Sequence, residues 1–178
     1  MAAVPLFISY AHEEEKWLNL LTTHLASLEN DGLIEVWDDR EIRAASEKTW
    51  EAQLLPRLES AGIVVIILSP DFAKSRYCQE VELPRAIARK ERRQALVFFV
   101  LARPYAIEQS IRRFQILPKA SQSLKQLRDR DAALTDVVEQ IRAAIEEVPR
   151  VQPPALYVQA LTQRLPPYLP YRATAPSR

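Results

Sequence analysis

The sequence predicts an α/β protein whose parallel sheet is covered by helices on both faces. Short apolar segments alternate along the chain with segments in which apolar residues recur every three or four positions. The strand-like segments are almost continuously apolar, as burial of both faces of a sheet requires. With 178 residues, 48% of them apolar, the chain is long enough for one domain with a modest tail.

The first part of the chain predicts two strands separated by a helix. Residues 4–9 (VPLFIS) form a short apolar run that indicates a buried strand. Residues 12–30 have apolar side chains on one helical face, and acids in the first turn favour the helix dipole. Asp31 and Gly32 are expected to end this helix. Residues 33–37 (LIEVW) alternate and indicate the second strand.

The remaining segments continue the alternation. We expect a polar loop at 38–48, a helix at 49–61 and a strand at 62–68 that Ser69 and Pro70 end. A helix at 77–93, capped by Ser75, and a strand at 95–101 follow. Residues 103–125 are expected to be irregular, with one short strand near 115–117 or Leu124, and the last helix covers 131–148. Right-handed crossovers between these strands predict a doubly wound, mainly parallel sheet covered on both faces. A flavodoxin-like, three-layer α/β/α fold with strand order 2-1-3-4-5 fits these units.

Composition excludes several classes of function. The net charge of +1 gives no argument for a nucleic-acid partner or an anionic membrane. One cysteine and two histidines predict neither a disulfide framework nor a metal site. We expect no signal peptide and no membrane span of about 20 apolar residues, hence a cytoplasmic protein. With two glycines, the chain has no glycine-rich phosphate loop.

Residues 149–178 differ from the rest of the chain in composition. Seven prolines lie between Pro149 and Pro176, and they limit any helix to about residues 155–165. We interpret residues 1–148 as the folded domain and 149–178 as a proline-rich linker or tail. An aromatic docking segment that uses Tyr157, Tyr168 and Tyr171 is the alternative.

Polar and aromatic side chains follow the first two predicted strands, at the edge where open α/β sheets bind ligands. Ser9 and Tyr10 end the first strand and are expected to point into a cleft at this edge, although this motif taken alone favours a helix cap and a packing tyrosine. The second strand ends in Trp37, Asp38, Asp39 and Arg40. These residues suit ribose hydroxyls and phosphate, or form a solvated loop with weak ion pairs.

The third strand is followed by a helix that carries Tyr77, Cys78 and Glu82. Cys78 and Glu82 are four residues apart and therefore share a helix face, whereas Glu80 points elsewhere. The simpler alternatives are a buried packing role for Cys78 and a surface ion pair of Glu82 with Arg85 or Arg89. Pro84 predicts a kink near Glu82, or a helix that begins properly only at Pro84.

Three segments together resemble a Toll/interleukin receptor (TIR) domain of the bacterial type, which occurs as an N-terminal module of larger defence or signalling proteins. They are PLFISYAHEEE, LIEVWDDREI and SAGIVVIILSPDFAKSRYCQEVEL, in that order and spacing. The later segments VFFVLARP, FQILPK and DAALTDVVEQIRAAI are similar to that subgroup's fourth strand, following loop and last helix. The resemblance covers about residues 4–148.

The resemblance implies one of two functions: cleavage of NAD+ at the nicotinamide–ribose bond, or assembly with other TIR domains as a non-enzymatic scaffold. It implies that Glu82 is the catalytic carboxylate. The substrate-binding positions it implies are Phe7, Ser9, Tyr10, Trp37, Asp38, Arg40, Tyr77 and Cys78. The self-assembly loop it implies comprises Arg43, Ala44, Ala45, Ser46, Glu47 and Lys48, and this loop lacks the family's usual glycine. Position 78 carries an aromatic residue in some enzymatic relatives.

Partners and cofactors follow from the same resemblance. It implies a homo-oligomer of TIR domains that acts in antiphage defence or innate immune signalling, with no metal and with NAD+ as substrate rather than cofactor. It also implies a downstream ATPase or sensor module in the full-length protein. The chemistry agrees with a single carboxylate, because nicotinamide leaves from a cationic pyridinium and needs no proton, unlike the leaving group of an ordinary glycosidase.

Overall fold

One sheet of five parallel strands forms the centre of the molecule. The computed structural model describes residues 3–38, 47–118 and 122–148, and for residues 47–51 the backbone alone. The strand order is β2-β1-β3-β4-β5, which confirms the predicted topology. The strands are β1 (Val4–Ser9), β2 (Ile34–Trp37), β3 (Ile63–Leu68), β4 (Leu96–Leu101) and β5 (Ile116–Leu117).

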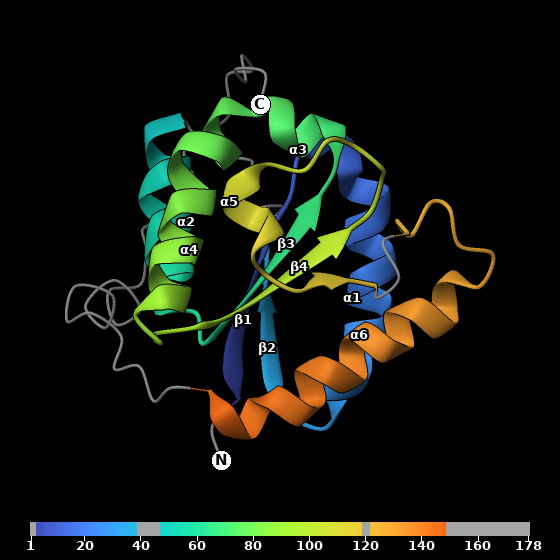
Figure 1. Cartoon of the computed structure of the whole chain (residues 1–178). Coiled ribbons are helices and arrows are strands. Elements are labelled where there is room, and N and C mark those ends of the chain that lie inside the picture. Colours follow the sequence, from blue (N-terminus) through green and yellow to red (C-terminus); the bar gives the residue numbers. More distant parts are fainter. Residues whose placement is uncertain (1–2, 39–46, 119–121, 149–178) are drawn as a thin grey trace, which may run out of the picture.

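Helices cover both faces of this sheet. They are η1 (His12–Glu14), α1 (Glu15–Asn30), α2 (Glu47–Ser60), α3 (Pro70–Lys74), η2 (Cys78–Glu82), α4 (Leu83–Glu91), α5 (Gln109–Arg112), α6 (Arg130–Ala144) and η3 (Ile145–Glu147). Helices α1 and α6 lie side by side on one face, and α2 and α4 cover the other (Figure 1). All strands point the same way, so their carboxyl ends form one edge, at the top of Figure 1.

Alternation along β3 shows why its sequence is apolar throughout. Ile63, Val65 and Ile67 belong to the core against α1 and α6. The intervening residues, Val64, Ile66 and Leu68, belong to the core against α2 and α4. Burial of an aliphatic side chain of this size contributes about 1.5–3 kcal/mol to folding, so both faces of the central strand stabilise the fold.

Local signals set several element boundaries. Gly32 has φ of 68° and follows Asp31, the C-cap of α1, in the left-handed conformation that glycine adopts without strain. The Ser69 hydroxyl accepts a hydrogen bond from the Phe72 backbone N–H at 3.0 Å and caps α3, whose first residue is Pro70. The Asp129 carboxylate accepts one from the Ala132 N–H at 2.8 Å and caps α6.

Some boundaries differ from the sequence prediction. The short helices α3 and α5 were not predicted, because four or five residues carry too little periodicity to detect. Helix α2 begins at Glu47, so Glu47 and Lys48 form its first turn rather than the end of the polar loop predicted at 38–48. An acid suits the first turn of a helix. Residues 39–46, with Arg40 and Arg43 to Ser46, lie outside the described residues, as does the predicted tail 149–178.

The described residues offer neither a helix for crossing a membrane nor a cluster for holding a metal ion. No helix in this part of the chain has both the length and the apolar character needed to cross a membrane. Within the same residues, histidine, cysteine and acidic side chains nowhere gather in a group of three that could hold a metal ion.

Candidate functional site

A buried hydrogen bond joins the ends of two neighbouring segments at the carboxyl edge of the sheet. The Ser9 hydroxyl donates to Oε2 of Glu82 at 2.6 Å, across 73 residues of sequence. Ser9 is the last residue of β1 and is 2% exposed, and Glu82 is 1% exposed. The carboxylate that the sequence singled out therefore lies at the predicted edge and is held by a side chain from an adjacent strand.

Glu82 ends a π-helical turn rather than a regular α-helix. The Leu83 N–H donates to the carbonyl of Cys78, five residues earlier, and α4 then begins with Pro84 in its first turn. Proline lacks an N–H and its ring clashes with the carbonyl of the preceding turn, so a regular helix could not pass through residue 84. The predicted interruption is confirmed, and π-helical turns are frequent at functional sites.

Several predicted substrate-binding residues lie on the same face of the sheet as Glu82. Phe7 and Trp37 are paired in register between β1 and β2. Phe7 and Cys78 belong to the core under α2 and α4, against which Trp37 and Tyr77 also pack. The Cys78 backbone N–H donates to the Ser75 hydroxyl at 3.3 Å, which confirms Ser75 as the cap of this helical segment. The sheet register thus gathers these side chains with Ser9 and Glu82.

Tyr10 does not share that face. Its side chain is 1% exposed and belongs to the core against α1 and α6, on the other side of β1. The expectation that Ser9 and Tyr10 both point into one cleft is therefore wrong, because successive residues of an extended chain point to opposite faces. The backbone of Tyr10, by contrast, contacts the Glu82 side: the Cys78 thiol donates to its carbonyl at 3.7 Å.

Glu82 is not the surface acid of the simpler alternative, because its side chain is buried. Arg85 pairs with Glu59 at 3.5 Å and donates to the Val81 carbonyl. Arg89 donates to the carbonyls of Leu58 and Gln94, and its burial lowers its pKa. Glu80, predicted to point away, is exposed and pairs with Arg76 at 3.3 Å.

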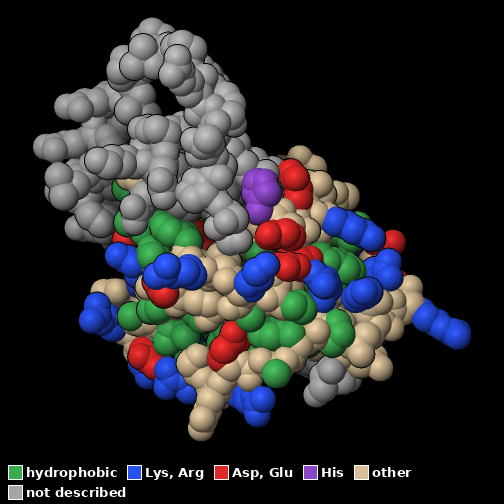
Figure 2. Space-filling model, turned by 90° about the horizontal axis from the view of Figure 1, so that it is seen from above, with side chains coloured by type: hydrophobic (Ala, Val, Ile, Leu, Met, Phe, Trp, Pro, Cys, Tyr) green, Lys and Arg blue, Asp and Glu red, His purple; other side chains and the backbone are tan. Residues whose placement is uncertain are grey.

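Most described residues of the candidate site are buried in this conformation. Phe7, Ser9, Asp38, Cys78 and Glu82 are buried, whereas Trp37 and Tyr77 are half-buried. Seen from the end of the molecule at which the strands terminate, described acidic and basic side chains alternate and do not gather by sign (Figure 2).

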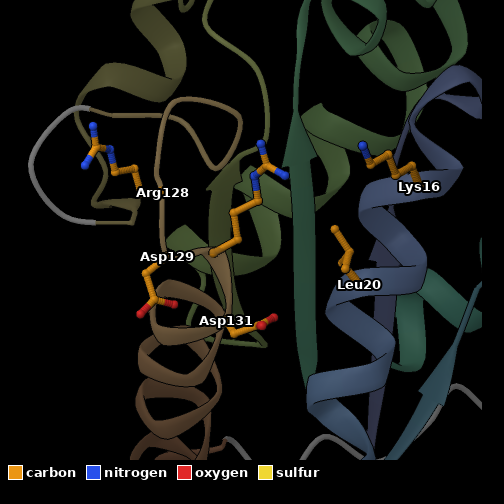
Figure 3. A pocket seen from close by; sticks show the side chains of 6 residues that line it. Lys16, Leu20, Arg128, Asp129 and Asp131 are labelled. Atoms are coloured by element: carbon orange, nitrogen blue, oxygen red, sulfur yellow. The ribbon is translucent and has the colours of Figure 1, made fainter.

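A hollow of about 600 Å³ lies elsewhere, between α1 and the start of α6. Lys16 and Leu20 of α1 line it on one side, and Arg128, Asp129, Arg130 and Asp131 line it on the other. Among the side chains labelled in Figure 3, Asp131 points toward α1. Apart from Leu20, its wall consists of charged side chains of both signs, whereas small-molecule sites are mostly apolar with a few placed polar groups. We therefore place the candidate site at Glu82 and not in this hollow.

Charged residues that the sequence analysis did not single out also meet at this edge. Arg103, just after β4, pairs with Glu14 after β1 and with Asp71 after β3. Polar residues that follow parallel strands lie at one edge of the sheet. Because Arg103 follows the fourth strand, the sequence contains the signal that places it there.

Comparison with known proteins identifies the family. The TIR domain family matches residues 6–138, so the chain belongs to the TIR domain family. The uncharacterized protein y4lF of Sinorhizobium fredii (strain NBRC 101917 / NGR234) is 28% identical over 165 residues, which are 91% of this chain and 50% of that protein. The chain thus spans about half the length of this relative.

A solved structure agrees on the fold. The crystal structure of the TIR domain of the Toll-related receptor TRR-2 from Hydra magnipapillata has a TM-score of 0.56, with 20% identity, over 79% of this chain and 99% of that one. TIR domains generally act in signalling and interact with other TIR domains, and the family includes enzymes that cleave NAD+.

Proposed function

We propose that this domain cleaves NAD+ at the bond between nicotinamide and ribose, with Glu82 as the catalytic carboxylate. The observation that carries the proposal is the Ser9–Glu82 hydrogen bond of 2.6 Å at the carboxyl edge of the sheet. A carboxylate at this depth costs free energy to bury, and a protein that needed only packing there would be better served by an apolar side chain.

The chemistry requires one anion and no metal. As the C1′–N bond breaks, its electron pair moves to the ring nitrogen and neutralises the pyridinium, so nicotinamide leaves without a proton. The ribose becomes an oxocarbenium-like cation, which the Glu82 carboxylate stabilises from the site wall. Water adds at C1′ and releases one proton, which gives ADP-ribose; attack by a nucleophile within the same molecule gives a cyclic isomer instead.

Burial of Glu82 bears on how the reaction is started. Because this carboxylate is 1% exposed, substrate reaches it only after the edge of the sheet opens. We propose that association with other copies of the domain opens the site, so that activity rises steeply with protein concentration. In defence signalling, such a domain would form one module of a longer cytoplasmic protein, and the length of the y4lF relative supports that setting.

The test compares two glutamates of the same turn. Concentrated protein is incubated with NAD+, and nicotinamide release is followed by chromatography for wild type, Glu82→Gln and Glu80→Gln. Electrostatic stabilisation of this kind contributes about 10²- to 10³-fold, so Glu82→Gln should lose at least about 10²-fold in kcat. Glu80→Gln should keep wild-type activity, because Glu80 is exposed and pairs only at the surface with Arg76. Full activity of Glu82→Gln would disprove the role of Glu82.

The same burial supports a second candidate, a TIR scaffold without enzymatic activity. A closed site with Cys78 four residues before Glu82, where some enzymatic relatives carry an aromatic side chain, suits a domain that only assembles. A scaffold would form oligomers as concentration rises but release no nicotinamide at any concentration. Sedimentation and nicotinamide release, measured on the same samples, separate the two functions.

A further inference from the structure

Arg103 joins three segments that leave the sheet at its carboxyl edge. Its Nη1 donates to Oε1 of Glu14 at 2.7 Å and to Oδ2 of Asp71 at 2.6 Å. Arg103 follows β4, Glu14 ends η1 after β1, and Asp71 lies in α3 after β3. One guanidinium therefore links the segments that follow three adjacent strands.

The cluster is more tightly bound than an ordinary surface ion pair. The Glu14 side chain is 3% exposed, and Arg103 and Asp71 are about one-third exposed. A carboxylate as buried as Glu14 requires a cation, and hydrogen bonds from Arg103 to both acids raise the pKa of the guanidinium. By contrast, the pair between Arg142 and Asp31 lies at the surface, at the end of α1.

Both acids are linked to the residues of the candidate site. Glu14 lies five residues after Ser9 on the same connection. From Asp71, hydrogen bonds continue toward Glu82: the Ser75 N–H donates to the Asp71 carbonyl at 3.0 Å, and the Gln79 N–H donates to the Ser75 carbonyl at 3.0 Å. Gln79 already belongs to η2, the turn that ends at Glu82.

We infer that Arg103 is a positioning residue that holds the connection after β1 and the connection after β3 together, so that Ser9 and Glu82 meet. Without the cation, Glu14 and Asp71 repel each other and the buried Glu14 draws water, which separates the two connections. The consequence for catalysis rests on the proposed function, whereas the effect on the two connections does not.

The chain contains its own probe of this separation. Cys78 is the only cysteine, is 0% exposed, and contacts the Tyr10 carbonyl through its thiol. The Cys78 thiol thus lies where the connection after β1 meets η2. A thiol reagent reaches it only when these segments part, so its labelling rate measures local opening.

The experiment measures Cys78 labelling by an aromatic disulfide reagent across low urea concentrations. Arg103→Met keeps the apolar stem and removes the charge, and it should raise the rate without urea about tenfold or more, with little dependence on urea. Arg103→Lys should restore part of the protection. Asp71→Asn, which leaves the buried Glu14–Arg103 pair intact, should give a smaller increase. Arg142→Met, the matched surface control, should label like wild type.

Two outcomes would overturn the inference. The first is a Cys78 labelling rate in Arg103→Met equal to that of wild type. The second is an increased labelling rate that depends on urea as steeply as global unfolding does. In the NAD+ assay, Arg103→Met should lower kcat with little change in KM. If wild type releases no nicotinamide, the proposed function fails, and the labelling rates alone still decide whether Arg103 positions these segments.

Discussion

Replacement of Ser9 by alanine tests the central contact of the site. The change removes only the hydroxyl that donates to Glu82 at 2.6 Å and leaves the Cβ in its buried position. A buried hydrogen bond to a charged acceptor contributes about 1.5–3 kcal/mol, so the free energy of unfolding of Ser9→Ala should fall by about 2 kcal/mol. Little of this loss should come from packing, because a hydroxyl leaves almost no void.

Urea denaturation of Ser9→Ala, Glu82→Gln and the double variant measures the coupling between the two side chains. The amide oxygen of Glu82→Gln still accepts from Ser9, but a neutral hydrogen bond is roughly half as strong, so the coupling should be about 1 kcal/mol. Ser27→Ala is the matched control: its hydroxyl donates to the His24 carbonyl at 3.3 Å on an exposed helix face. The free energy of unfolding of Ser27→Ala should fall by no more than about 0.5 kcal/mol.

If Ser9→Ala unfolds at the same urea concentration as wild type and the double-mutant cycle shows no coupling, the buried carboxylate does not depend on Ser9. If the domain releases nicotinamide, Ser9→Ala should also lower kcat about tenfold, because the carboxylate loses its orientation. A change confined to KM would assign Ser9 to substrate binding instead.

Two further predictions concern stability. In Gly62→Ala the new methyl would lie 2.7 Å from Val148 Cγ1 and 2.8 Å from Val4 Cγ1. Urea denaturation should therefore show a free energy of unfolding lower by about 1–3 kcal/mol, partly recovered when Val148→Ala is added. An unchanged denaturation midpoint would contradict this packing. Asp129→Ala removes the cap of α6 and should cost about 1 kcal/mol, whereas Asp129→Ser should retain most of the stability; equal losses in both variants would argue against capping.

Much of the fold could be predicted because its signals are local. Apolar runs, helical spacing and the Asp31–Gly32 stop were sufficient for the strands and the main helices. The sheet order was predicted from the flavodoxin-like pattern that alternating strands and helices fit, and it is confirmed. Pro84 predicted the interruption that appears as the π-helical turn ending at Glu82, because the steric restriction of proline acts within one turn. The short helices α3 and α5 escaped prediction because few residues carry their signal.

The candidate site was predictable only in part. Glu82, Ser9 and Trp37 could be assigned to one edge, since parallel strands end together. Tyr10 was placed on the wrong face although alternation along a strand is itself a local rule. The burial of the site could not be read from residue types, because exposure depends on how separate segments pack.

The sequence by itself determined that this chain is a doubly wound α/β domain of the TIR family, with a carboxylate at the carboxyl edge of its sheet. The tertiary structure decided which groups hold that carboxylate: Ser9 donates to Glu82 over 73 residues, and Arg103 joins Glu14 to Asp71. Periodicity and capping act over a few residues, whereas these contacts exist only once the sheet has brought β1, β3 and β4 side by side. The physical basis of the site is therefore the order of the strands.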